Sequence, residues 1–294
     1  MKLTRVYFGL LSLAFALCLP ITSAHAQATR TWVSGVGDDV NPCSRTAPCK
    51  TFAGAISKTA AAGEINCLDP GGFGAVTITK SITIDCSETF GSVLVSGTNG
   101  IVISSAGIKV TLRNLDIQGL NTGLSGILIL NAAEVVIDHC RITEFTTAAI
   151  NISTGGNIVG QILDTAISQT PTGVIVGTSS GQAHFALTNA RIEGTTSAGV
   201  EAVTGGSVSV FNSTISNNSG SATFATGTLY LANSIFDNNG VTFNAGAGGT
   251  VFVSNNEVTN TVEAFHTTGT ISSAGNNRIA SGSGAPNGAA ISIK

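Results

Sequence analysis

The stretch VFNSTISNNSG at residues 210–220 returns with few changes as LANSIFDNNG at residues 231–240. Asn212 and Asn233 begin the shared part, and 21 residues separate them. In both copies an apolar residue follows three positions after the asparagine, and a pair of asparagines comes soon after it. Self-similarity at this period indicates a repeat architecture, which outranks local propensity as a guide to the fold.

The same motif, an asparagine-like residue three positions before an apolar one, extends over most of the chain. We call these positions the corner column, and consecutive members are 21 to 25 residues apart. Asn tolerates the left-handed backbone conformation, and its amide can bond to the next repeat. We therefore predict that each repeat makes the same sharp, ladder-forming corner at Asn114, His139, Asp164, Asn189, Asn212, Asn233, Asn255 and Asn276.

Short runs of alternating apolar and polar residues lie between the corners, for example at residues 109–112 and 207–210. This period of two predicts strands, about three in each repeat. If each strand pairs with its counterpart in the next repeat, the chain is an all-β parallel solenoid of about ten coils in a single domain. The residue three positions after each corner should face the core, and the residue before it, such as Asp116 or Arg141, should face solvent.

The two ends of the chain differ from the repeats. Residues 1–26 have the basic start, the apolar run and the Ala24-His25-Ala26 cleavage signal of a secretory signal peptide. We expect a secreted, periplasmic or cell-surface protein without a membrane span after cleavage. Residues 27–62 should form a strand, a cysteine loop and a helix over residues 50–62 that caps the first coil, and residues 63–294 should form the β-helix domain.

Five cysteines follow the signal peptide, and an oxidising compartment allows them to form disulfides. Cys43 and Cys49 flank a short loop, so we predict that they pair. Cys67 and Cys86 are the next candidate pair. Cys140 then remains as a small buried apolar residue.

The charge balance argues against two classes of partner. Without Lys2 and Arg5 the chain has 11 basic and 16 acidic residues, a net charge of about −5. Binding to nucleic acid or to an anionic membrane draws on clustered Lys and Arg. We therefore expect neither, and an extracellular or cell-envelope polysaccharide is the partner that we consider.

The beginning of the mature chain carries a set of spaced Gly, Pro, Asp and Thr positions around the expected helix. These are Trp32, Gly37, Asp39, Asn41, Pro42, Pro48, Thr51, Gly63, Ile65, Pro70 and Gly71. In this pattern the chain resembles secreted right-handed parallel β-helix proteins of the pectate-lyase-like superfamily. The resemblance implies a right-handed helix but leaves activity open, because the superfamily includes lyases, hydrolases, epimerases and adhesins.

One internal segment is similar to an enzyme motif of that superfamily. VVIDHC at residues 135–140 resembles the W-I-D-H-C segment of pectate lyases, with Val136 in place of the Trp. The Arg-x-Pro-x-x-Arg signature of those lyases and the polygalacturonase signatures are missing. Asp138 and His139 thus match only a fragment of the lyase motif.

If the protein is a lyase, its catalytic residues would be charged side chains of two adjacent coils. Its candidate catalytic residues are Arg141 as the base and Asp116, Asp138 and Glu144 around it. Calcium would be needed only in this reading, to engage the carboxylates. The alternative is a solvated face with a few ion pairs, each contributing less than about 1 kcal/mol.

Polysaccharide could also bind without reaction along a polar edge of the rod. The candidate contacts are Arg191, Glu193, Asn217, Asn218, Asp237 and Asn238. We expect few aromatic platforms for sugar, because Trp32 and Tyr230 are the mature chain's only Trp and Tyr and most Phe should be buried. His139 should bond to the next corner at Asp164, and His184 and His266 lack partners at metal-ligand spacing, so we expect neither a metal site nor a cofactor.

Two functional hypotheses follow. The first is an exported, non-catalytic β-helix that acts as a structural or polysaccharide-binding surface protein. The second is a carbohydrate-active enzyme, such as a polysaccharide lyase or a related hydrolase or epimerase. The missing lyase and hydrolase signatures favour the first.

Overall fold

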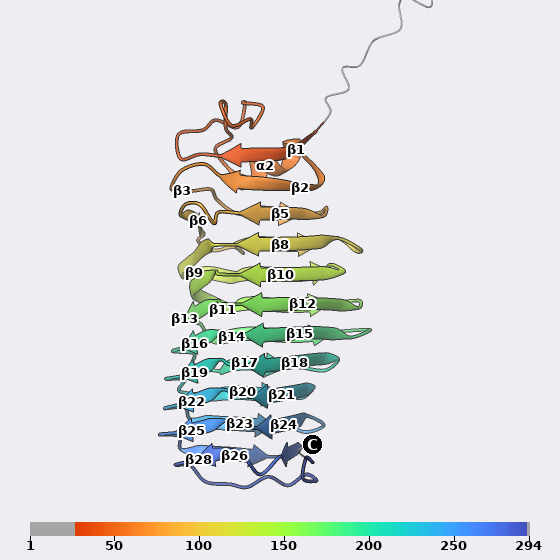
Figure 1. Cartoon of the computed structure of the whole chain (residues 1–294), viewed down its shortest axis with the longest axis vertical. Coiled ribbons are helices and arrows are strands. Elements are labelled where there is room, and N and C mark those ends of the chain that lie inside the picture. The colour runs from red at the N-terminus through yellow and green to blue at the C-terminus, as the bar shows by residue number, and fades with distance from the viewer. Residues whose placement is uncertain (1–26, 293–294) are drawn as a thin grey trace, which may run out of the picture.

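The computed structural model describes residues 27–292, so the expected signal peptide lies outside the described residues. One face of the molecule is a parallel sheet of eleven strands stacked along the long axis (Figure 1). In spatial order they are β1 (Ala28–Val33), β2 (Thr59–Cys67), β5 (Ile82–Asp85), β8 (Lys109–Arg113), β10 (Glu134–Asp138), β12 (Ile158–Leu163), β15 (Ala183–Thr188), β18 (Gly206–Phe211), β21 (Thr228–Ala232), β24 (Thr250–Ser254) and β27 (Thr270–Ser273).

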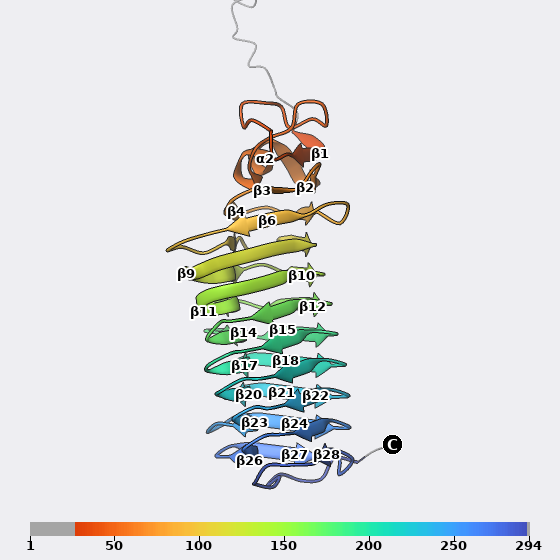
Figure 2. The same ribbon diagram turned by 90° about the vertical axis from the view of Figure 1, so that its left-hand side faces the viewer.

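The remaining strands close each coil, and each pairs in parallel with its counterparts in the neighbouring coils. Figure 2 faces this side, where the two longest strands run round a corner as continuous bands. The strands are β3 (Gly71–Gly72), β4 (Val76–Ile78), β6 (Gly91–Leu94), β7 (Ile101–Ser104), β9 (Leu115–Asn131), β11 (Arg141–Thr154), β13 (Ala166–Ser168), β14 (Thr172–Thr178), β16 (Arg191–Glu193), β17 (Ala198–Ala202), β19 (Thr214–Ser216), β20 (Ser221–Ala225), β22 (Ile235–Asp237), β23 (Val241–Ala245), β25 (Glu257–Thr259), β26 (Glu263–Thr267) and β28 (Arg278–Ile279).

The prediction of an all-β, right-handed parallel β-helix is confirmed, with about nine turns where about ten were expected. The corner column is also confirmed in its backbone. Seven of its eight members have a φ between 47° and 54°, in the left-handed region. Asn276 differs: it lacks a left-handed φ, and its side-chain oxygen accepts a hydrogen bond from the Asn255 backbone N–H at 2.9 Å.

A second left-handed corner lies five residues after the first, and the sequence analysis did not foresee it. The strands β19 and β22 are only three residues long because each lies between a first and a second corner. This second column consists of Glu144, Gln169, Gly194, Asn217, Asn238 and Asn260, with φ between 51° and 67°. The asparagine pairs of the opening motif therefore mark a second corner, and their first members occupy it.

The residue after most corners points into the rod, and in the C-terminal half of the rod these residues form a buried polar ladder. Ser234 donates its backbone N–H to the Asn256 side chain at 3.0 Å, and Ser213 donates its own to the Ser234 hydroxyl at 3.2 Å. At the second corner the side-chain oxygen of Asn239 accepts from the Asn218 backbone N–H at 3.3 Å and from the Asn218 side-chain N–H at 2.8 Å. These bonds satisfy backbone groups that a buried corner would otherwise leave unpaired.

The core is the expected apolar column together with the inward residues of the main sheet. Ile117, Ile142, Ile167, Ile192, Ile215, Phe236 and Val258 are all buried. The expectation that Asp116 faces solvent is wrong, because its side chain is only 4% exposed. Arg141 of the next coil reaches over this carboxylate and covers it.

The N-terminal end is closed by the expected capping helix, which is shorter than expected. α2 (Phe52–Lys58) ends where Thr59 turns into β2 and its hydroxyl bonds to Thr31. Phe52 packs against Phe73 with ring centroids 5.2 Å apart. Asp39 holds the start of the helix by accepting hydrogen bonds from the backbone of Lys50 and from Thr51.

Both predicted disulfides, Cys43–Cys49 and Cys67–Cys86, are present, and Cys140 is free and buried. Burial raises the pKa of the Cys140 thiol to about 12, which makes it unreactive at neutral pH. Between residues 27 and 292 no helix combines the length and apolarity that a membrane crossing requires.

Candidate functional site

The lyase candidates do not converge on one point. Arg141 forms an ion pair with the buried Asp116, whose same oxygen also accepts from Gln118 at 2.9 Å. Asp138 lies on the outer face of β10, and Glu144 occupies the second corner. Within residues 27–292 no hydrogen bond or ion pair joins either of these two to Arg141.

The other oxygen of Asp116 is buried and has no hydrogen-bond partner among the described residues. Such an oxygen could face a cation. However, calcium binds six to eight oxygen ligands, several of them usually carboxylates, and the neighbours that contact Asp116 are a guanidinium and an amide donor. The described residues therefore do not fit a calcium site at Asp116.

The polysaccharide-binding candidates mostly bond to one another. Arg191 pairs with Glu193 at 2.7 Å, and Asn238 donates to Asn217 at 2.9 Å. Hydrogen bonds from Thr259 and Asn260 lower the pKa of Asp237.

The prediction that Asn218 is a surface contact is wrong, because this residue is only 1% exposed. Its side-chain oxygen accepts from the backbone and hydroxyl of Thr195, and its amide donates to Asn239. The position follows from the second corner, which turns Asn217 outward and Asn218 inward.

Ionisable groups gather instead at the first corner of two adjacent coils. His139 Nδ1 lies 2.6 Å from Asp138 Oδ1, so the expected bond from His139 to Asp164 is replaced by one within its own coil. This bond raises the pKa of His139; burial acts in the opposite direction, and the charges of Asp138 and Asp164 add to the rise. One ligand atom from each of Asp138, His139 and Asp164 falls within 4.8 Å of the others.

A polar cleft of about 370 Å³ lies at the N-terminal end of the main sheet. Trp32 points outward from β1 into it, and Arg45 enters from the disulfide-closed loop. That loop is fixed to the strand because Trp32 exchanges backbone hydrogen bonds of 2.9 Å with Cys43 and Cys49. The cleft is also lined by Arg30, Glu64, Asn66, Cys67, Leu68, Asp85, Ser87 and Glu88.

Most charges in this cleft compensate one another. Arg30 pairs with Glu64 at 3.0 Å, and Asp85 lies 3.7 Å from Arg113. Arg45 takes part in no ion pair within residues 27–292, although Glu88 also lines the cleft. The cleft thus combines one aromatic side chain, several hydrogen-bonding groups and a cation without a fixed carboxylate partner.

Most of the described Phe side chains are buried, as expected, but two aromatic side chains are exposed towards the other end of the same sheet. Tyr230 is 43% exposed and Phe211 38% exposed. Tyr230 stacks on Phe252 of the next strand, with centroids 5.0 Å apart and an interplanar angle of 8°. Because these two rings face each other, their shared faces are not open to a ligand.

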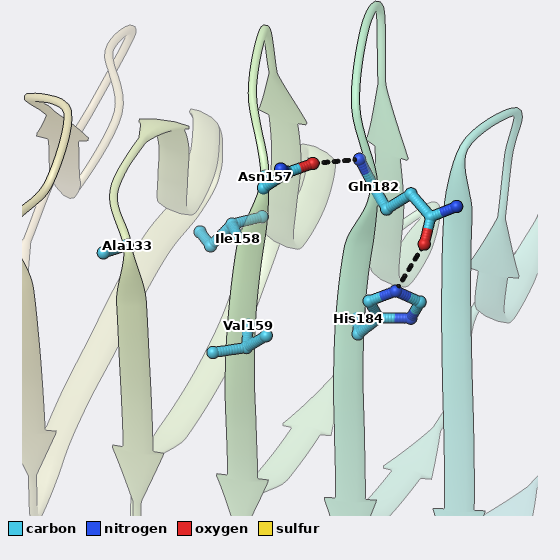
Figure 3. A pocket seen from close by; sticks show the side chains of 6 residues that line it. All are labelled: Ala133, Asn157, Ile158, Val159, Gln182 and His184. Carbon is cyan, nitrogen blue, oxygen red and sulfur yellow. Dashed lines mark hydrogen bonds between the residues drawn. The ribbon is translucent and has the colours of Figure 1, made fainter.

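A shallow hollow of about 430 Å³ lies between these two regions, at the edge of the main sheet (Figure 3). The Gln182 side-chain oxygen accepts a hydrogen bond from His184 Nε2 at 2.9 Å, and the Gln182 backbone N–H donates to the Asn157 side-chain oxygen at 2.9 Å. The other lining residues are Ala133, Ile158 and Val159. Neither carboxylate nor permanent cation lines the hollow, so it offers little for catalysis.

Comparisons with known proteins give a likeness in structure but none in sequence. No protein-family model matches the chain. No curated protein matches it either. Among solved structures the chain is similar to pectate lyase Pel9A, with a TM-score of 0.60 and 14% sequence identity over 92% of this chain and 83% of that one. At this identity the likeness concerns the fold alone: the chain has the parallel β-helix fold that pectate lyase Pel9A also has.

Proposed function

We propose that the protein is an exported β-helix that binds an extracellular or cell-envelope polysaccharide without cleaving it, and that the Trp32 cleft is the binding site. The observation that supports this most is the cleft itself: an outward Trp surrounded by hydrogen-bonding side chains on a rigid sheet. An aromatic face covers the apolar side of a sugar ring, and surrounding polar groups fix its orientation.

Arg45 supports an acidic sugar as the preferred unit. A guanidinium binds a carboxylate through two parallel hydrogen bonds, and Arg45 has no ion-pair partner within residues 27–292. The Cys43–Cys49 disulfide holds its loop against β1, so the cation is placed before the ligand arrives. Preorganisation of this kind lowers the entropic cost of binding.

Two disulfides and the expected signal peptide support export. The arrangement of Arg141 supports a role without catalysis. A general base has to accept a proton from the substrate, whereas this guanidinium is engaged by the Asp116 carboxylate. The lyase alternative rests on the shared fold and on this same pair of residues.

The test is an affinity measurement of the mature protein on an array of neutral and uronate-containing polysaccharides, followed by titration of the ones bound. We expect Trp32→Ala to weaken binding by about five- to a hundredfold, since loss of a stacking aromatic costs on the order of 1–3 kcal/mol. Arg45→Ala should weaken binding to uronates more than to neutral glycans. Tyr230→Ala, an exposed aromatic on the same sheet far from the cleft, is the matched control and should bind like the wild type.

The same polysaccharides are then incubated with the protein, with and without calcium, while ultraviolet absorbance is followed for unsaturated uronate. We expect no product from pectate, alginate or chondroitin. Calcium-dependent product that disappears in Arg141→Ala would replace the binding role by the lyase alternative. Binding that survives Trp32→Ala would remove the cleft from the proposal.

A further inference from the structure

We propose that the corner made by Asp138, His139 and Asp164 binds a divalent transition-metal ion of the zinc class. The two coils meet at this corner, where one nitrogen or oxygen ligand atom from each residue lies within 4.8 Å of the others. The site is on the surface, since the His139 side chain is 64% exposed and the Asp138 side chain 22%. It lies outside the Trp32 cleft and does not depend on sugar binding.

The ligand types suit such an ion. Zinc binds imidazole nitrogen and carboxylate oxygen at about 2.0–2.2 Å, usually with four ligands. Around a tetrahedral ion these bond lengths place ligand atoms about 3.4 Å apart. The farthest pair, within 4.8 Å, would have to close by at most about 1.4 Å, and the Asp138 and His139 atoms, now 2.6 Å apart in their hydrogen bond, would have to separate slightly; rotation of the side chains allows both. Calcium and magnesium favour sites made wholly of oxygen ligands, which a set containing imidazole does not offer.

The backbone already holds the ligands in position. His139 and Asp164 occupy left-handed corners, with φ of 51° and 47°. The His139 N–H donates to Leu163 at 3.0 Å, and the Asp164 N–H donates to Thr188 at 3.0 Å. Neighbouring coils of a parallel sheet are about 4.8 Å apart, so the fold sets the spacing of the two ligands without ordering a loop.

The corner column itself shows that these two positions differ from the rest. Elsewhere the column is asparagine, and two of its amides bond along the stack, as Asn255 does to Asn233 at 2.8 Å. A metal-ligating side chain replaces the asparagine at two adjacent coils, as His139 and Asp164, and at no other member of the corner column. Asp138 precedes the first of them directly, which completes the three-ligand set.

The surrounding groups leave the cluster able to accept a cation. Arg113 Nε is 3.6 Å from Asp138 Oδ2, beyond a strong charged hydrogen bond. Asn189 donates to one oxygen of Asp164 at 3.2 Å. A dication would bring together two carboxylates that otherwise repel each other, and Asn189 would remain as a partner that orients Asp164.

The test is isothermal titration of chelator-treated mature protein with zinc chloride, and separately with cobalt(II) chloride while visible absorption is recorded. We expect one equivalent of each ion to bind, with micromolar affinity because three protein ligands on an exposed corner leave the rest of the shell to water. His139→Asn and Asp164→Asn install the residue that the column uses elsewhere, so the corner should fold. Each should weaken zinc binding by at least tenfold.

The control is His266→Asn, which removes the imidazole from another His–carboxylate pair, His266 with Glu263 at 3.1 Å. This variant should bind zinc like the wild type. A measurement that needs no variant is the nuclear magnetic resonance spectrum with cobalt(II), where the ring signals of His139 should broaden before those of His184 and His266. Absence of one-equivalent binding, binding unchanged in both Asn variants, or broadening centred on another histidine would overturn the proposal.

Discussion

At the scale of single residues, the fold depends on side chains that tolerate a left-handed backbone. The two corner columns contain thirteen residues in the left-handed conformation, which is strained for most side chains. Eight of them are Asn, and the others are Asp, His, Glu, Gln and Gly. The left-handed conformation costs other residues roughly 1–2 kcal/mol each. After the corners at Asn212 and Asn233 the next residue, Ser213 or Ser234, points inward and bonds to the following coil.

Asn233 gives a direct test of the two contributions. Asn233→Ala should lower the free energy of unfolding by about 2 kcal/mol, because it adds left-handed strain and removes the acceptor of the Asn255 amide. Asn233→Gly removes the same acceptor without the strain, so its loss should be about half as large. Urea unfolding followed by circular dichroism measures both, and equal losses would show that the backbone conformation carries no cost here.

The residue scale also shows where sequence reasoning reached its limit. The first corner could be predicted because its Asn recurs at fixed distance from a core residue. The second was hidden because Glu144, Gln169 and Gly194 share no side-chain type, although the doubled asparagines at 217–218 and 238–239 carried the signal. The burial of Asp116 could not be predicted, since it depends on the reach of Arg141 from another coil.

At the scale of elements, the short helix α2 is positioned by a single carboxylate. Asp39 accepts from the Lys50 N–H at 2.8 Å, the Thr51 N–H at 2.9 Å and the Thr51 hydroxyl at 2.7 Å. Thr51 in turn is the N-cap and accepts from Gly54 at 2.9 Å. The helix has only seven residues, too few to be stable by itself, so its place over the first coil depends on these bonds.

Partial burial of Asp39 acts to raise its pKa, but the bonds from Thr51 and Lys50 outweigh this, so the pKa is lowered. A lowered folded-state pKa gives stability that is present above the unfolded value and is lost as pH falls through the folded value. Asp39→Asn should therefore destabilise the protein at neutral pH, by about 1–3 kcal/mol for the weakened charged hydrogen bonds. The difference from wild type should shrink in acid.

Thermal unfolding between pH 7 and pH 2 measures this dependence. Asp38→Asn changes the neighbouring exposed carboxylate, which accepts only from Val40 at 3.0 Å, and should have little effect. An Asp39→Asn difference that stays constant with pH would mean that the charge of Asp39 does not hold the helix.

At the scale of the whole molecule, the rod is a one-dimensional stack in which each coil contacts mainly its two neighbours. Its ends are unequal. Two disulfides and α2 secure the N-terminal coils. At the other end the segment after β28 covers β27 with a few bonds, including Gly288 to Ile271 at 2.8 Å and Ile291 to Ser273 at 3.0 Å.

Amide hydrogen exchange should therefore be fastest in β26 to β28 and slowest in the main-sheet strands β5 to β10, because opening of an end coil exposes only its own bonds. Mass spectrometry of peptides from the exchanged protein measures this gradient. After reduction of the disulfides the N-terminal coils should exchange faster as well. Uniform protection along the rod would contradict independent coils.

The overall architecture was predictable because the same residue pattern recurs in every coil, so an atypical residue in one coil does not hide the pattern. The candidate site was not, because it is built from features that occur once. The disulfide loop that brings Arg45 to Trp32 and the pair of corners that brings His139 to Asp164 depend on contacts between coils, which a single sequence does not encode as a pattern.

Trp32, described above as the aromatic wall of the cleft, is also the only tryptophan in the chain. It sits on the first strand of the stack, beside the disulfide loop. Its fluorescence therefore reports on the N-terminal coils and does not report on the C-terminal coils. An emission-monitored melt would follow the most firmly tied coils and could stay unchanged while distant coils open, whereas a sugar arriving in the cleft would alter the same emission directly. The protein thus carries its own optical probe for the proposed ligand, placed where partial unfolding disturbs it least.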